Sequence, residues 1–195
     1  MKHAFALFAF ILLALGQLAA KADPFLIVPG RSIGQTHLGR DGDKIVKRLP
    51  SPTIFEHHMM QSNLVWVSRP TAGHRQETLY LHRVNNGVLD PPGPGEAVSG
   101  EAVDAIRVTS PQFRTRGGIG SGSLLRQILR RFPHSQPVDG DRTVYADSVR
   151  GIAFEFRRKA IADARCIAVT VFPVGDVRII NAAQVRDLLR SGELH

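Results

Sequence analysis

Three groups of residues in this chain have types and spacings that could support chemistry. The first, His57-His58-Met59-Met60, places two imidazoles beside two thioethers, and this donor set suits copper. Neighbouring side chains of a strand point to opposite faces, so four consecutive residues do not converge on one ion by themselves. Copper binding is therefore kept as an alternative function, and no metal site is assigned.

The second group is the glycine-rich run from Gly117 to Ser123, which precedes a predicted helix. Glycines before a helix can expose backbone N–H groups to a phosphate. A phosphate loop needs Lys before Ser or Thr, and a dinucleotide fingerprint needs a third glycine where this chain has Ser123. The run therefore predicts a tight turn that uses the conformational freedom of glycine.

The third group is a set of arginine pairs, Arg130-Arg131 and Arg157-Arg158. The chain has a net charge of +8, and a positive surface favours anionic partners. We predict contact with an envelope protein or an anionic envelope surface, and no contact with nucleic acid, because the chain is predicted to be exported. Aromatic residues are common anchors of interfaces, so Trp66 and Tyr145 join the arginines as interaction candidates.

Catalytic signatures are not found among the remaining residues. No nucleophile-elbow pattern is present, and Glu155 alternates with Phe154 and Phe156, which predicts the solvent face of a strand. Cys166, the single cysteine, lies in an apolar run and is predicted to be a small buried hydrophobic residue. We therefore predict a protein that is not an enzyme and needs no cofactor.

Residues 1–22 are typical of a secretory signal peptide. Lys2 precedes an apolar run from 4 to 15, and Ala20-Lys21-Ala22 fits a cleavage site. The run is shorter than the roughly 20 apolar residues that a bilayer span requires, so no transmembrane anchor is expected. Cleavage before Asp23 would leave 23 basic and 17 acidic residues, a net charge of +6, on a periplasmic or secreted protein.

An internal repeat organises the rest of the chain. Gly39 and the segment 45–50 recur 83 residues later as Gly122 and the segment 128–133. Each copy is predicted to contain a short helix and then strands, at 64–67, 79–81 and 105–110 in the first copy and at 143–146, 152–156 and 166–171 in the second. The predicted fold class is α+β, with two tandem units (23–111 and 112–195), each a short helix packed on a three- to four-stranded antiparallel sheet. A Pro/Gly-rich insertion at 90–100 and a C-terminal helix at 181–190 complete the prediction.

The pattern Pro29-Gly30-x-x-Ile33-Gly34-x-x-x-Leu38-Gly39, followed by a helix ending in Leu49-Pro50 and a meander, resembles SmpA/OmlA-type exported bacterial proteins. It also resembles the tandem-repeat β-lactamase-inhibitor proteins. The resemblance covers most of 23–175 and implies a non-enzymatic binding module. The expected function is protein–protein interaction or cell-envelope assembly and maintenance, and the alternative is a periplasmic carrier of copper or of a small ligand.

Overall fold

The structure is a computed structural model that describes residues 23–39, 42–58, 61–69, 76–85, 101–138, 140, 142–177 and 180–192. The predicted signal peptide at 1–22, the predicted insertion at 90–100, Met59 and Met60 lie outside these ranges. No helix in the described ranges is both long enough and apolar enough to cross a bilayer.

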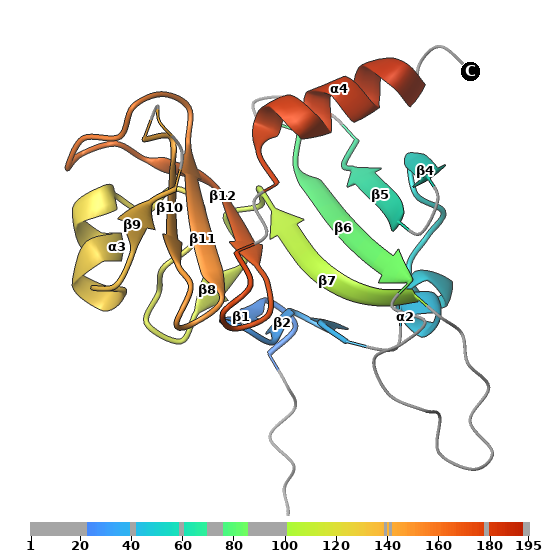
Figure 1. Cartoon of the computed structure of the whole chain (residues 1–195), viewed down its shortest axis with the longest axis horizontal. Helices are drawn as coiled ribbons and strands as arrows, with labels where there is room; N and C mark the ends of the chain where they lie inside the picture. Colours follow the sequence, from blue (N-terminus) through green and yellow to red (C-terminus); the bar gives the residue numbers. More distant parts are fainter. Residues whose placement is uncertain are drawn as a thin grey trace, which may run out of the picture.

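One large antiparallel sheet forms the centre of the molecule (Figure 1). Its strand order is β4-β5-β6-β7-β12-β11-β10-β9. The first four strands are a meander of β4 (Ile54–His58), β5 (Gln61–Val67), β6 (Thr78–Asn85) and β7 (Glu101–Val108). The other four are β9 (Gln136–Pro137), β10 (Val144–Asp147), β11 (Ile152–Phe156) and β12 (Cys166–Val171). Pairing between β7 and β12 joins the two meanders into one sheet.

A smaller four-stranded sheet has the order β3-β2-β1-β8. It consists of β1 (Leu26–Val28), β2 (Ser32–Ile33), β3 (Thr36–His37) and β8 (Arg114–Thr115), and β1 runs parallel to β8. Gly30 and Gly151 connect this sheet to the turn between β10 and β11, because the N–H of Gly30 donates to the oxygen of Gly151 at 3.0 Å. Both have positive φ, and a Cβ on Gly151 would collide with Gly30 and Phe172, so this close approach requires glycine.

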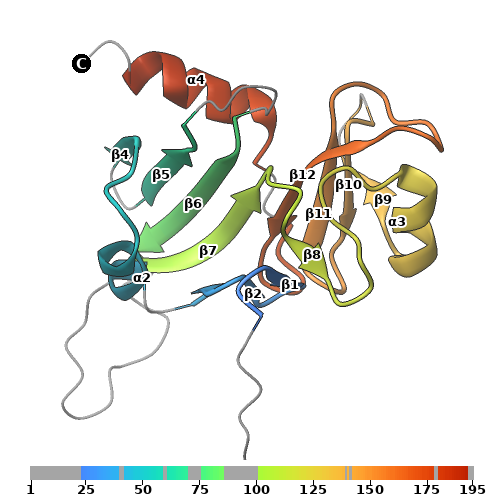
Figure 2. The same cartoon turned by 180° about the vertical axis from the view of Figure 1, so that it is seen from behind.

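The described residues contain three helices, α2 (Gly42–Arg48), α3 (Leu125–Arg131) and α4 (Ala182–Gly192). Figure 2 shows α2 and α3 at opposite ends of the molecule. Helix α3 buries Leu125 and Ile128, as their helical spacing predicts, but Leu129, which the same spacing places on the apolar face, is 36% exposed. Helix α4 lies where the sequence predicts a C-terminal helix, and the Asn181 side chain caps it by accepting hydrogen bonds from the N–H groups of Ala183 and Gln184, each at 3.0 Å.

The main core lies on one face of the large sheet. The small sheet, α2 and α3 all contribute to it, through Ile27 and Ile33, Ile45, and Leu125 and Ile128 respectively, against sheet residues such as Leu81, Ile106 and Phe154. Helix α4 covers part of the opposite face over the first meander (Figure 1), with Ile180 and Val185 packed against Val65, Tyr80 and Ala105. Apolar burial on both faces stabilises the sheet at about 25 cal/mol per Å² removed from water.

The predicted fold of two tandem helix-on-sheet units is therefore wrong. The structure is mostly β, with two sheets and three helices in its described part. The reason lies in β7 and β12, which were predicted as the last strand of each unit. Ile106 and Val108 pair directly with Val171 and Val169, so the two meanders share one hydrogen-bonded sheet and one core.

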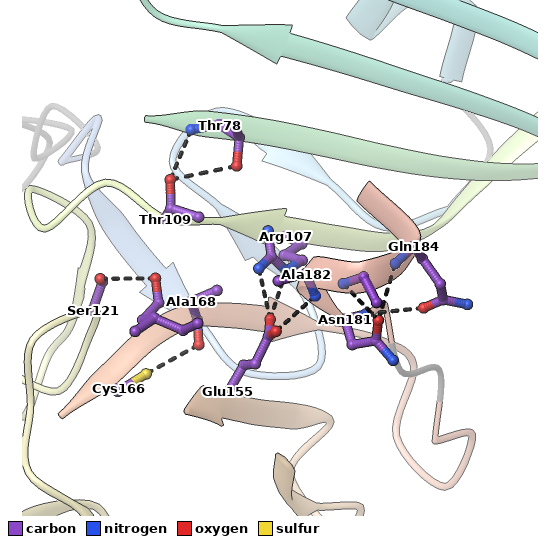
Figure 3. A network of polar contacts seen from close by, with 12 residues as sticks. Thr78, Arg107, Thr109, Ser121, Glu155, Cys166, Ala168, Asn181, Ala182 and Gln184 are labelled. Carbon is purple, nitrogen blue, oxygen red and sulfur yellow. Dashed lines mark hydrogen bonds and ion pairs between the residues drawn. The ribbon is translucent and has the colours of Figure 1, made fainter. Parts of the chain in front are cut away.

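The prediction that Glu155 faces solvent is also wrong, because only 7% of the surface of Glu155 is exposed. Arg107 reaches it across β12 and donates from Nε and Nη2 to Oε2 at 3.1 and 2.6 Å (Figure 3). The backbone N–H of Ala182, at the start of α4, donates to the other carboxylate oxygen at 2.6 Å. Glu155 therefore ties β7, β11 and α4 together, a role that strand alternation alone does not indicate.

Cys166 is buried as predicted, with 2% of its surface exposed. Its Sγ donates to the backbone oxygen of Ala168 at 3.0 Å, and burial raises the pKa of the thiol to about 12. The thiolate is the reactive form of cysteine, so this residue is a core residue without nucleophilic character at neutral pH.

Candidate functional site: an arginine cleft

The two aromatic interaction candidates are packed into the fold. Tyr145 is 6% exposed and makes an edge-to-face contact with Phe156 at 5.8 Å between ring centroids. Trp66 is partly buried against the main core, and its indole N–H donates to the backbone oxygen of Pro50 at 2.7 Å. Both rings therefore have structural partners, and Tyr145 presents little surface to another molecule.

Two of the candidate copper ligands, His57 and His58, lie at the end of β4. His57 is half exposed, and its Nδ1 lies 2.9 Å from Oγ of Ser62, which donates to Glu101. The side chain of His58 is not described, and Met59 and Met60 lie outside the described ranges. Within the described residues, no group of three or more His, Cys, Asp or Glu side chains is placed to hold a metal ion.

The two arginine pairs that the sequence analysis selected as interaction candidates lie in different surroundings. Arg130 and Arg131, in the last turn of α3, line two adjoining hollows together with Arg116, which follows β8, and Arg150, in the turn between β10 and β11. We call the two hollows together the arginine cleft, defined by Arg116, Arg130, Arg131 and Arg150. Arg157 and Arg158, in the loop after β11, are exposed but do not line it.

The hollows share Gly117, Arg130 and Arg131 and have volumes of about 320 and 790 Å³. The described residues that line them include no Asp or Glu. Guanidinium groups remain charged at all physiological pH values. Several of them around a hollow without lining carboxylates create a positive potential that attracts anions.

Arg150 is the most firmly held of the four. Its Nη1 donates to the backbone oxygen of Arg131 at 2.8 Å, and its guanidinium carbon lies 5.3 Å from the ring centroid of Phe132. Asp147, which is fully buried behind it, lies 3.9 Å from Nε. Arg150 therefore closes one side of the cleft in a defined position, and part of its charge is offset by Asp147.

The other three arginines form no ion pair within the described residues. Arg126 of the same helix, by contrast, pairs with Asp163, and Arg83 pairs with Glu101 at 2.7 Å. The side chain of Arg131 lies over Gly117, where Nε is 3.6 Å from the position of a Cβ on that glycine. The cleft thus gathers three guanidinium groups without an ion pair in the described structure, beside Arg150, whose Nη1 already donates to Arg131.

The glycine-rich run does not form a phosphate cradle, which agrees with its prediction as a tight turn. The backbone N–H groups of Gly118, Ile119 and Gly120 donate to Thr115 or Ser123, and that of Gly122 donates to Cys166. At the start of α3, the N–H groups of Leu125 and Arg126 donate to backbone oxygens of the loop before β12. Because these amides have partners, recognition of an anion in the cleft depends on side chains.

A third hollow of about 580 Å³ lies between α4 and strands β4 to β6, and several polar groups on its strand side bond to one another. Tyr80 donates to Oδ1 of Asn63 at 2.5 Å, and Asn63 donates to Glu56 at 2.8 Å. Nδ1 of His82 lies 2.6 Å from a carboxylate oxygen of Asp104. Burial, with smaller contributions from Asp104 and Glu56, raises the pKa of Tyr80 well above its usual range, so this phenol stays a neutral donor.

Sequence reasoning selected Arg130 and Arg131 but not Arg116 and Arg150 as members of one site. These four residues come from three segments that are distant in the chain, since Arg116 follows β8 and Arg150 lies in the turn between β10 and β11. The pairing of β1 with β8 and the contact between Gly30 and Gly151 bring the segments together. No local pattern in the sequence predicts either of these two contacts.

The fold and the cleft define a mostly β protein with a basic surface cleft. No known protein family matches the chain, and no curated protein matches it. A similar solved structure is the uncharacterized protein yfeY from Escherichia coli, with a TM-score of 0.35 and 10% sequence identity, over 76% of this chain and 94% of that chain. A likeness this distant carries no argument about function.

Proposed function

We propose that the chain is an exported, non-enzymatic binding module of the cell envelope, and that its arginine cleft holds an anionic group of its partner. The observation that carries this proposal is the gathering of Arg116, Arg130 and Arg131, without ion-pair partners in the described structure, around hollows that no described carboxylate lines. The partner is an envelope protein or the anionic envelope surface itself.

The form of the arginine side chain supports this proposal. A guanidinium carries five N–H donors in a planar fork that fits carboxylate and phosphate oxygens in pairs. Like charges brought together repel one another, so a cleft of this kind is stabilised when an anion occupies it. Arg107 and Arg126 obtain the same stabilisation from Glu155 and Asp163 inside the molecule.

Two side chains in the described part of the chain, Ser62 and Cys166, are candidate nucleophiles, and their burial favours a binding role over catalysis. Ser62 touches both His57 and Glu101, but its side chain is fully buried, so no substrate reaches its oxygen. Cys166 is buried and protonated. Neither side chain meets the requirement for an accessible, activated nucleophile.

The test compares two double variants of the exported protein that remove the same charge. Arg130→Ala/Arg131→Ala alters the cleft, whereas Arg157→Ala/Arg158→Ala alters exposed arginines outside it. Binding to anionic phospholipid vesicles and to envelope extract is measured at 0.1 M and 1 M salt, between which the Debye length falls from about 10 to about 3 Å. We expect the cleft variant to lose most of the binding and the control variant to keep most of it.

Two outcomes would contradict the proposal. Equal losses in the two variants would indicate a diffuse charge effect, because both remove two positive charges. Binding that does not change between the two salt concentrations would exclude an electrostatic contact.

A further inference from the structure

We infer that the arginine cleft takes an amphipathic anion, a phosphate monoester joined to an alkyl or acyl chain. This inference rests on the proposed function and specifies the class of ligand. It comes from a division within the cleft, whose two hollows share Arg130 and Arg131 but are otherwise lined by different kinds of residue.

The smaller hollow is lined by groups that can donate hydrogen bonds. Gln127 uses its side-chain oxygen to accept the N–H of Leu124 at 2.9 Å, which leaves its NH₂ group as the free end. Oγ of Ser123 accepts from the N–H of Gly120 and from Arg114, so its hydroxyl hydrogen remains to donate. With Arg130 and Arg131 beside them, these groups suit a ligand end that only accepts hydrogen bonds.

A phosphate monoester is such an end. It carries about −1.5 to −2 charges at pH 7 and three strong acceptor oxygens. A carboxylate carries one charge and two oxygens, and Arg150 and Asp147 already partly offset each other. Arg130 and Arg131, which line both hollows and form no ion pair in the described structure, therefore match a doubly charged group better than a singly charged one.

The larger hollow has an apolar floor. Leu26, Val28 and Pro29 are half-buried there, and the buried residues Ile27 and Phe132 also line it. Its volume of about 790 Å³ lies in the range of about 300 to 1,000 Å³ that small-ligand sites occupy. The floor continues directly from Arg130 and Arg131, so one ligand can place its anionic end and its chain in the two hollows together.

An acidic peptide fits this cleft less well than an acyl or alkyl chain. The floor is built by β1, which is hydrogen-bonded to β2 on one side and to β8 on the other. Its backbone groups are thus engaged, and a peptide could not add to it as a further strand, which is how extended peptides gain much of their affinity. An alkyl chain needs no such partners.

The experiment uses ligands that share a head group and differ in chain length. Inorganic phosphate, butyl phosphate and octyl phosphate are titrated into the exported protein by calorimetry, below micelle-forming concentrations, with octyl glucoside as an uncharged control. A fully buried methylene improves binding by up to about fourfold. We expect octyl phosphate to bind at least about tenfold more tightly than butyl phosphate, and octyl glucoside to bind weakly or not at all.

Variants then separate the two halves of the cleft. Leu26→Asn and Val28→Thr keep side-chain size but make the floor polar, so they should reduce the advantage of the octyl chain and leave the affinity for inorganic phosphate unchanged. Retained phosphate affinity also shows that a variant is folded, and Val28→Thr is the milder of the two changes. Arg130→Ala/Arg131→Ala should abolish binding of every phosphate, whereas Arg157→Ala/Arg158→Ala should not.

The possible failures are distinguishable. If inorganic, butyl and octyl phosphate bind equally and only the cleft variant loses them, the cleft binds anions but the amphipathic ligand is excluded. If no phosphate binds while an acidic protein partner still requires Arg130 and Arg131, the ligand class is wrong and the proposed function stands. If no anion of any kind depends on the cleft, both are wrong.

Discussion

Replacement of Glu155 by Gln should be among the most destabilising charge-removing substitutions in this chain. Glu155 and Arg107 have side chains that are 9% and 2% exposed, and their closest nitrogen–oxygen distance is 2.6 Å. The same carboxylate accepts the N–H of Ala182 at the beginning of α4. The substitution leaves the shape nearly unchanged but leaves the Arg107 charge without its counter-ion.

The magnitude follows from that burial. Removing one partner of a buried ion pair costs about 3–5 kcal/mol, because the remaining charge stays desolvated. Gln still offers Arg107 one acceptor oxygen, so the lower end of about 3 kcal/mol applies, but its NH₂ group then faces the N–H of Ala182, which loses its acceptor. With a urea slope of about 2 kcal/mol/M, the unfolding midpoint should fall by about 1.5 M, a large part of the total stability of a typical domain.

The assay is urea unfolding followed by circular dichroism, with Asp163→Asn as the matched control. Asp163 also pairs with an arginine, but the two side chains are 67% and 52% exposed, and exposed pairs contribute about 0–1 kcal/mol. Hydrogen exchange at Ala182 should accelerate only in Glu155→Gln. A loss below about 1 kcal/mol in Glu155→Gln, or an equal loss in the control, would refute the reasoning.

Three further predictions test the core, the cysteine and export. Ile128→Ala should lower the free energy of unfolding by about 2–5 kcal/mol, because Ile128 is fully buried. Leu129→Ala, on the exposed side of α3, should lower it by less than about 1 kcal/mol. Equal losses in the two variants would contradict the packing of α3. Cys166 should resist thiol reagents at pH 8 until the chain unfolds. Its contribution to stability should decline as the pH rises above about 9, because the thiol ionises there in the unfolded chain while burial raises its pKa in the native protein to about 12. Rapid labelling of the native protein, or an unchanged alkaline pH profile in Cys166→Ala, would contradict this prediction. Intact mass of the exported protein should correspond to a chain that begins at Asp23, and a mass that retains residues 1–22 would exclude cleavage there.

Long periodic segments were predicted well from the sequence, and short paired ones were not. Helix α3, helix α4 and strands such as β11 and β12 have apolar residues at clear spacings that reflect local geometry, although β11 buries Glu155 on the face that alternation assigns to solvent. Strands β1, β2, β3, β8 and β9 have only two or three residues each. A strand of that length has no measurable period, because its existence depends on a partner elsewhere in the chain.

The proposed internal repeat predicted a helix followed by strands in each half, but it missed the short strands and did not predict how the halves combine. A repeat of 83 residues is equally compatible with two closed sheets and with one continuous sheet. The two arrangements differ in whether β7 and β12 are edge strands or neighbours. The pairs Val108–Val169 and Ile106–Val171 show that they are neighbours in one sheet. These contacts are buried on the core face, and unpaired backbone at a buried sheet edge would be costly.

The charge of the chain predicted an anionic partner, but only the structure separates arginines with different roles. Arg107 is neutralised inside the fold and Arg126 at the surface, whereas Arg130 and Arg131 point into a cleft together with Arg116 and Arg150. Arg157 and Arg158 look equivalent to Arg130 and Arg131 in the sequence, yet they line neither hollow of that cleft. If charge alone determined binding, these two pairs would be interchangeable. The cleft makes them different, because only Arg130 and Arg131 combine positive charge with an adjoining apolar floor and a fixed third side formed by Arg150.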